Sequence, residues 1–412
     1  MLVYYGTSLR SASGASARQA LDNVTHTLVA ATLARTPLAR AGRGTTAALI
    51  LASNAPDIDI VATAGGALKY LEWHRGPTHG PIGIVGLGLA SAGLVWIGRH
   101  VRARWTAARE TSQSQLQEQA RPQAQDASFG MLAAVSIIGV LVHVLMDLPT
   151  SYGTRLLSPF DWHWFGADWM PIIDIYLLMI LVASLFGRAT PSQAQRKAAI
   201  VLALIAADYG LRGATHRQAL DLAPRLFGPT LPEPCDAPPA AVTLIESWPR
   251  RAPPSPPPPG RRCLVEIAAM PSFVSPFQWR IIAQMSNAYE IHDIDLLNRE
   301  FTDADSASEA PWRLTLRYPN VWTADVRSAA STRLGQKFLA FSRFPAARST
   351  LDPRGIATVR FTDVRFVGGV TALDQPAPRG GLFTATVRML ADGRVLDTSL
   401  GPMERERRTL RP

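Results

Sequence analysis

The segment Glu72-Trp73-His74-Arg75-Gly76-Pro77-Thr78-His79-Gly80 places two histidines five residues apart, around a Gly-Pro break. It is followed at once by an apolar, uncharged run from Pro81 to Gly98. A run of this length is typical of a helix that spans a lipid bilayer. The sequence therefore predicts a histidine pair on a tight turn at the start of a membrane helix. We expect the rest of the N-terminal half to bring further ligands to this turn.

The composition separates the chain into two unlike halves. Of its 412 residues, 47% are hydrophobic and only 18% are charged, whereas an ordinary soluble protein has about 25% charged residues. Residues 1–211 contain the long apolar runs, and residues 212–412 are polar and rich in proline. The net charge of +10 is spread over both halves without a block of like charge, which argues against a nucleic-acid-binding surface.

Further apolar runs predict a multi-helix, all-α integral membrane domain over residues 21–211. We expect helices from about Val24 to Pro37 and from Thr45 to Ser53, and over Pro81–Gly98, Phe129–Leu148, Met170–Gly187 and Ala198–Leu211. The first two and the last are short for a full crossing. Residues 1–20 have no apolar core of the signal-peptide type and are expected to form a disordered extension.

The C-terminal half predicts a small α+β soluble domain over residues 261–412. Residues 212–260 precede it as a helix and a Pro-rich, polyproline-like linker. Alternation of β-branched and aromatic residues predicts strands within Arg262–Ala283, Trp312–Tyr318, Thr358–Val367, Leu382–Met389 and Arg394–Leu400, and an amphipathic helix over Thr323–Phe341.

Arginine-rich loops predict the orientation in the membrane. By the positive-inside rule, loops 35–43, 99–121 and 188–197 belong to the cytoplasm. Threaded in this way, the helices bring every candidate ligand, and the C-terminal domain, to the outer side. The chain has two cysteines, Cys235 and Cys263. They could form a disulfide outside the cell, would stay reduced in the cytoplasm, or could be unpaired and buried.

Eight histidines and aspartates near the ends of the apolar runs are candidate site residues: His26, Asp57, Asp59, His74, His79, His143, Asp147 and Asp174. His143 and Asp147 share one helical face at i and i+4. Ionisable groups at membrane depth are costly, so they are candidates for function. Imidazole with carboxylate favours a divalent metal such as Zn²⁺, Mn²⁺ or Fe²⁺, and Mg²⁺ remains an alternative.

Each candidate also has an ordinary structural interpretation. His143 and Asp147 could form a hydrogen bond between helices, Asp57 and Asp59 an Asx turn after Pro56, and His26 a helix cap. His74 and His79 could be polar residues at the membrane interface, and Asp174 a polar contact between helices. Eight candidates are more than one tetrahedral ion needs, so either two metals share them or some of them orient a ligating histidine.

A metal at this place would lower the pKa of its bound water and supply a hydroxide nucleophile. Asp147 and Asp59 are then the candidate catalytic carboxylates, since an aspartate can act as general base. Two other classes stay open. A non-catalytic membrane protein could use the cluster to bind or transport metal or protons, or the metal could only hold the helices together.

The motifs Asp22-Asn23-Val24-Thr25-His26-Thr27-Leu28, Pro56-Asp57-Ile58-Asp59, His74-Arg75-Gly76-Pro77-Thr78-His79 and His143-Val144-Leu145-Met146-Asp147 occur in this order. Together they resemble the YdjM-like family of membrane-bound, predicted metal-dependent hydrolases, some of them described as LexA-regulated inner-membrane proteins. The resemblance covers about residues 21–187 and implies a multi-pass protein of the bacterial inner membrane. Gly80 stands where the family usually has serine. For a site at the membrane edge, we expect a lipid or envelope ester or phosphoester as the substrate.

Overall fold

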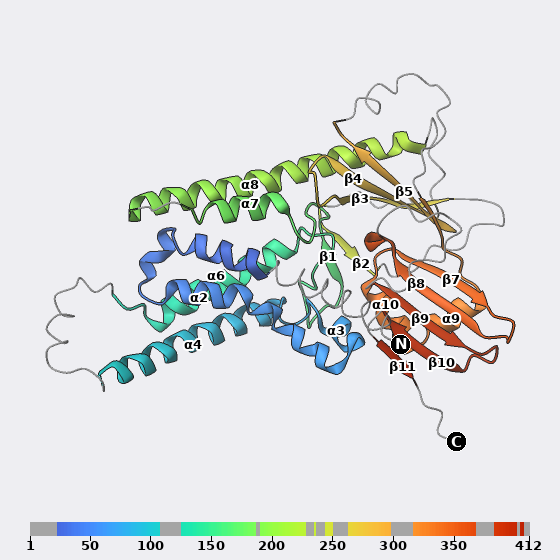
Figure 1. Ribbon diagram of the computed structural model, residues 1–412, viewed down its shortest axis with the longest axis horizontal. Coiled ribbons are helices and arrows are strands. Elements are labelled where there is room, and N and C mark those ends of the chain that lie inside the picture. The colour runs from blue at the N-terminus through green and yellow to red at the C-terminus, as the bar shows by residue number, and fades with distance from the viewer. Residues whose placement is uncertain are drawn as a thin grey trace, which may run out of the picture.

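The computed structural model of the chain describes residues 23–107, 125–186, 190–227, 235, 244–249, 263–297, 316–367, 383–401 and 404–407. Helices of the N-terminal half run side by side, and the strands of the C-terminal half gather at one end of them (Figure 1). The predicted disordered extension, residues 1–20, lies outside the described residues, as does most of the Pro-rich linker before residue 261.

The N-terminal half is helical. It contains a helix over residues 23–33, followed by α2 (Thr45–Asn54), the 3₁₀ helix η2 (Pro56–Gly65), α3 (Ala67–Trp73), α4 (Pro81–Ala107), α6 (Phe129–Asp147), α7 (Ile175–Ala183) and α8 (Pro191–Leu222). Among the described residues, α4, α6 and α8 are long and apolar enough to cross a membrane, and α2 with η2 adds a fourth span if this bent pair is one crossing. The predicted multi-helix membrane domain is therefore confirmed.

Close helix packing explains why α2, α4 and α6 form one bundle. An added Cβ at Gly88 of α4 would lie 2.6 Å from a side-chain carbon of Ile137 in α6. Similarly, Gly139 of α6 faces Ala52 and the Leu49 carbonyl of α2. Small residues permit such approach between membrane helices. As a result, the C-terminal ends of α2 and α6 meet the N-terminal end of α4.

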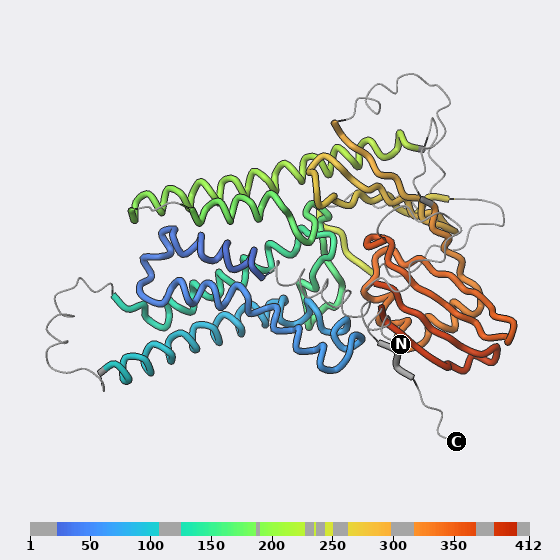
Figure 2. Tube along the Cα trace, in the orientation of Figure 1, coloured from blue at the N-terminus to red at the C-terminus, as the bar shows by residue number. Residues whose placement is uncertain are grey.

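Several predicted helix boundaries are wrong. α7 has nine residues, which gives about 14 Å, under half of the ~30 Å hydrocarbon core. α8 instead has 32 residues and a length of about 48 Å, so the boundary predicted at residue 211 falls inside a helix. α4 also continues beyond Gly98 to Ala107. The path of the chain through these helices can be followed in Figure 2.

The described residues of the C-terminal half form two antiparallel sheets, in agreement with the predicted α+β class. One has the order β3-β4-β5-β6 and the other β11-β10-β9-β8-β7. Their strands are β3 (Leu264–Pro271), β4 (Gln278–Met285), β5 (Ala288–Asp295), β6 (Leu316–Pro319), β7 (Pro345–Leu351), β8 (Ala357–Asp363), β9 (Thr384–Met389), β10 (Val395–Leu400) and β11 (Glu404–Arg407). The helices α9 (Ala324–Ala330) and α10 (Arg333–Phe341) pack on the five-stranded sheet.

Three sequence expectations in this half need correction. The β-rich stretch predicted over Arg262–Ala283 forms the hairpin of β3 and β4, with register Ile267↔Ala283, and β4 continues beyond it to Met285. Strands β5, β7 and β11 lie outside the predicted strand segments. The expected helix over Thr323–Phe341 is divided into α9 and α10, because Thr332 caps a new helix by accepting a hydrogen bond from the Gly335 amide.

A shared core joins the two halves. The short strand β1 (Trp164–Gly166) pairs with β2 (Glu246–Trp248), and the indoles of Trp164 and Trp248 stack 6.2 Å apart. Both belong to the same buried cluster as Phe338 and Phe361 of the C-terminal half. The Arg343 side chain, which is 6% exposed, reaches Asp168 at 2.5 Å, so a charged contact accompanies the apolar one.

Cys235 and Cys263 form a disulfide, with their Cα atoms 5.0 Å apart. The Cys235 amide also donates to the Leu264 carbonyl at 2.9 Å, which fixes this point of the chain on the first strand of the four-stranded sheet. Of the three arrangements considered for these cysteines, the structure therefore contains the paired one.

Candidate metal centre

Four segments bring buried histidines and aspartates together at one end of the bundle. Two overlapping groups could hold a metal ion: His79, His143 and Asp147, and His26, Asp57 and His143. They come from the helix over residues 23–33, from η2, from the turn before α4 and from the last turns of α6. All five side chains are buried. The close packing of α2, α4 and α6 brings the helix ends that carry them together.

The first group forms a nearly regular triangle, which we call the His79–His143–Asp147 triad. The Nε2 atoms of His79 and His143 are 3.3 Å apart, and they lie 3.3 and 3.4 Å from Asp147 Oδ2. Two ligand atoms at ~2.0–2.1 Å from a tetrahedral ion are ~3.3–3.4 Å apart. The donor atoms of the triad therefore fit one face of a tetrahedral coordination shell.

Hydrogen bonds on the far sides of the rings present the right nitrogens to such an ion. His143 Nδ1 donates to the Ser53 carbonyl at 2.7 Å, which leaves the lone pair on Nε2. His79 Nδ1 lies 3.0 Å from the Thr78 hydroxyl. Complete burial lowers the pKa of His79, which favours the neutral ring. A neutral imidazole held by a partner at Nδ1 is the usual form of a metal-ligating histidine.

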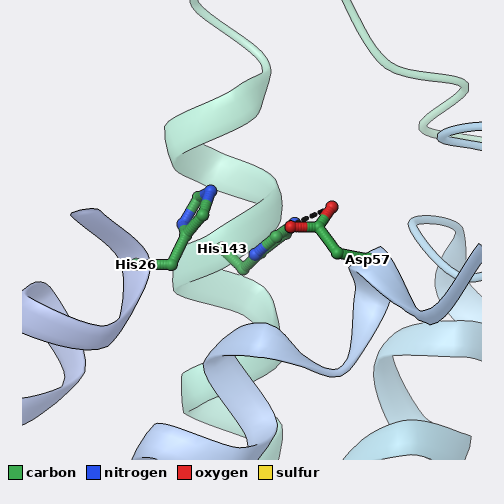
Figure 3. Close-up of side chains that lie close together, drawn as sticks. All are labelled: His26, Asp57 and His143. Atoms are coloured by element: carbon green, nitrogen blue, oxygen red, sulfur yellow. Dashed lines mark ion pairs between the residues drawn. The ribbon is translucent and has the colours of Figure 1, made fainter. Parts of the chain in front are cut away.

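The second group lies directly beside the triad. Figure 3 shows His143 between His26 and Asp57, with its Nε2 3.6 Å from Asp57 Oδ1. The rings of His26 and His143 stack with centroids 3.9 Å apart. Both groups need the single lone pair on His143 Nε2. In this arrangement they are therefore alternative sites for one ion rather than two separate sites.

Three predicted site residues lie outside both groups. His74 Nδ1 is 3.2 Å from both oxygens of Asp59, which also accepts a hydrogen bond from the Arg75 amide at 2.7 Å. Asp59 thus holds the turn through His74 and Arg75. It also lies near the triad, with its Oδ2 4.0 Å from His79 Nδ1. Asp174 caps α7 by accepting from the amides of Tyr176 and Leu177 and pairs with the buried Arg212.

Arg75 is a site residue that the sequence reasoning did not single out. Its guanidinium is buried and lies 3.1 Å from Asp147 Oδ1. The two histidines of the triad approach the other carboxylate oxygen, Oδ2. The Arg75 side chain also donates to Thr150 and to the Gly153 carbonyl. Its backbone has φ +50°, a left-handed conformation that costs a non-glycine residue about 1–2 kcal/mol. The sequence contained one signal for this role, because Arg75 is a charged residue between the candidate ligands His74 and His79.

A sequence model of the family described as YdjM inner membrane protein matches residues 21–219. This segment contains both ligand groups and Arg75, and it ends near the end of α8. No curated protein and no solved structure matches the chain.

Proposed function

We propose a metal-dependent hydrolase function for this chain, whose residues 21–219 belong to the YdjM inner membrane protein family. The observation that carries the proposal is the spacing of the His79–His143–Asp147 triad. Two imidazoles and one carboxylate would hold Zn²⁺, Mn²⁺ or Fe²⁺ in preference to Mg²⁺. When bound, such an ion lowers the pKa of a water ligand and makes a hydroxide nucleophile available near neutral pH.

The remaining residues have separate tasks in this proposal. Arg75 pairs with Asp147 Oδ1, which keeps Oδ2 directed at the histidines of the triad. Asp57 Oδ2 is buried and has no hydrogen-bond partner among the described residues, whereas both oxygens of Asp59 face His74. We therefore assign to Asp57, rather than Asp59, the acceptance of the proton that the attacking water loses. In such a hydrolysis the water oxygen would join the acyl carbon or phosphorus, the C–O or P–O bond to the leaving oxygen would break, and that oxygen would take up the proton that Asp57 accepted.

The position of the site supports a membrane-derived substrate on the periplasmic side. Arg99, at the opposite end of α4, donates to the carbonyls of Arg43 and Ala127, so arginines gather at the end away from the triad. The positive-inside rule assigns that end to the cytoplasm. The Cys235–Cys263 disulfide agrees with an oxidising compartment for the C-terminal half. A lipid or envelope ester or phosphoester would meet the site there.

One observation favours a second function, non-catalytic metal binding or transport. α2 and η2 are bent by 41° at a break, and Asp57 lies just after this break. Interrupted helices with ion-binding groups at the break are typical of transporters. Against this, the ligand groups lie at helix ends. Metal uptake by vesicles that contain the protein distinguishes this function from hydrolysis.

Hydrolysis is tested with the detergent-purified full chain on bis-p-nitrophenyl phosphate and on short-chain p-nitrophenyl esters. We expect His79→Ala and Asp147→Asn to lower the rate on the order of 100-fold or more, because each removes a ligand of the nucleophile-generating ion. Asparagine is chosen at 147 so that Arg75 keeps a polar partner. His163→Ala, in a partly exposed loop, is the matched control. Wild-type rates in both ligand variants would contradict the assignment.

A further inference from the structure

The ring of Tyr152 is the point at which the C-terminal half reaches the candidate metal centre. This side chain is buried, and its ring centroid lies 5.0 Å from the guanidinium carbon of Arg75 and 5.4 Å from the ring of His74. The same ring contacts Phe341 and Phe366 of the C-terminal half, with centroids 5.4 and 5.9 Å apart. One aromatic side chain therefore contacts both the turn that carries the ligands and the core beneath the five-stranded sheet.

Arg365 fixes the loop that carries Tyr152. It belongs to the 3₁₀ helix η5 (Val364–Phe366), and its buried guanidinium donates to the Ser151 carbonyl at 2.8 Å. Two further nitrogens of the same guanidinium bond both oxygens of Asp363, at 2.8–3.2 Å. A guanidinium held by two carboxylate oxygens has a fixed direction as well as a partner for its charge. The C-terminal half therefore holds the residue directly before Tyr152.

The same loop holds Arg75, the residue that pairs with Asp147. Arg75 Nη1 donates to the Thr150 hydroxyl at 3.3 Å and to the Gly153 carbonyl at 3.1 Å. The Thr150 hydroxyl in turn donates to the Asp147 carbonyl at 2.7 Å. Because the two acceptors lie on either side of Tyr152 in the chain, a shift of this loop would draw the Arg75 guanidinium away from Asp147 Oδ1.

We propose that Tyr152 and Arg365 are positioning residues of the metal centre, so that the C-terminal half takes part in directing the ligand Asp147. Arg365 lies beyond residues 21–219, so this support comes from a part of the chain outside the family segment. Contacts behind a ligating side chain set its direction, and their loss typically weakens metal affinity about 10–100-fold. The contact of Arg75 with the Tyr152 ring is buried, and a cation–π contact is strongest where water is excluded. The inference rests on the metal centre of the proposed function and does not depend on the bond that is cleaved.

Titration of the detergent-purified full chain with Co²⁺ tests the role of Tyr152. Co²⁺ is the probe because its visible absorption depends on the arrangement of its ligands. We expect Tyr152→Leu to weaken Co²⁺ binding about 10–100-fold and to change the spectrum, whereas Tyr152→Phe, which keeps a ring beside Arg75, should behave as wild type. Phe361→Leu is the matched control, since Phe361 belongs to the same buried cluster but packs against Phe338 and Trp322. Wild-type binding in Tyr152→Leu, or equal weakening in Phe361→Leu, would overturn the proposal.

Hydrogen exchange measured by mass spectrometry tests Arg365 without a metal. Arg365→Lys keeps a positive charge beside Asp363 but lacks the planar fork that also reaches the loop. We expect the amides of residues 75–79 to exchange on the order of 10-fold faster in this variant, because a hydrogen bond from a charged donor is lost. Arg280→Lys is the matched control, since Arg280 makes a bidentate pair with Asp293 in the four-stranded sheet. It should leave exchange at the turn unchanged.

The two experiments separate this inference from the metal site on which it rests. Unchanged exchange at residues 75–79 in both Arg365→Lys and Tyr152→Leu would overturn the inference, as would equal acceleration in Arg280→Lys. If the wild type binds no Co²⁺, the metal centre of the proposed function fails, while the exchange result still decides whether the C-terminal half holds this turn.

Discussion

At the scale of single residues, the hydrogen bonds behind the triad decide which nitrogens can bind a metal. Ser53 and His143 are 90 positions apart, yet the Ser53 carbonyl accepts the Nδ1 proton of the ring. Thr78 has the corresponding place beside His79. With Nε2 of His79 as the ligand atom, its Nδ1 donates to the Thr78 hydroxyl. Both rings are thus held in one tautomer and one orientation.

Replacing Thr78 therefore gives a specific expectation. Thr78→Val keeps the shape of the side chain but removes the acceptor, and it should weaken metal affinity about 10–100-fold. Thr78→Ser should restore affinity because it restores the hydroxyl. Competition with a chromogenic chelator on purified protein measures both values. Wild-type affinity in Thr78→Val would show that the hydroxyl does not orient His79.

The sequence indicates which histidines and aspartates come together more readily than it indicates their individual contacts. The i, i+4 spacing of His143 and Asp147 depends on one helix alone, and the structure retains it. The partners of Arg75 and Asp174 depend on packing between distant segments. Asp174 reaches Arg212 only because α7 lies against α8, and no local pattern contains this information.

At the scale of elements, the contact between α4 and α6 decides whether the ligands meet. An added Cβ at Gly88 would also lie 3.0 Å from the Ile137 backbone, whereas an added Cβ at Gly93 of the same helix meets nothing within 4 Å. Gly88 is therefore a contact residue of α4, and Gly93 is its natural control.

We expect Gly88→Leu to destabilise the bundle by roughly 1–3 kcal/mol through overpacking. Gly93→Leu should be neutral or stabilising, since leucine favours a helix more than glycine does. Thermal unfolding in detergent, followed by circular dichroism at 222 nm, compares the two variants. Equal melting temperatures for Gly88→Leu and wild type would contradict the packing described here.

Helix boundaries were predicted poorly where the apolar run and the helix do not cover the same residues. α8 continues through Asp208 and Arg212 because Arg212 has a buried partner, so its charge does not end the helix. The apolar run from Met170 to Gly187 forms only the short helix α7, because Asp174 caps it five residues into the run. In the C-terminal half, a tight turn before Gln278 divides one β-rich stretch into two strands.

At the scale of the whole molecule, the three membrane-length helices require one further crossing. α6 ends beside the triad, and α8 begins at the opposite end and finishes among the strands of the C-terminal half, as Figure 1 shows. The segment around α7 must therefore return the chain across the bundle. The triad and the C-terminal half consequently share one side, and the Arg43–Arg99 contact marks the other.

This arrangement predicts the state of the cysteines in cells. If the shared side is the periplasm, Cys235 and Cys263 should be oxidised, and their bond should add roughly 3–4 kcal/mol in the chain-entropy model. Thiol labelling of intact cells should detect no free cysteine until a reductant is added. Cysteines that are free, and that react only after lysis, would contradict the periplasmic assignment.

The central claim is that one buried site holds a divalent metal, and metal content tests it most directly. His143 is the matched choice for substitution because both ligand groups contain it. His100, exposed on α4 and bonded only to the Trp96 carbonyl among the described residues, is the control.

The measurement is elemental analysis of detergent-purified full chain after supplementation with zinc, manganese or iron. We predict about one equivalent of metal in wild type and in His100→Ala, and less than roughly a tenth of an equivalent in His143→Ala, because ligand loss removes most of the binding free energy. A wild-type protein without metal, or a His143→Ala variant with as much metal as wild type, would contradict the account.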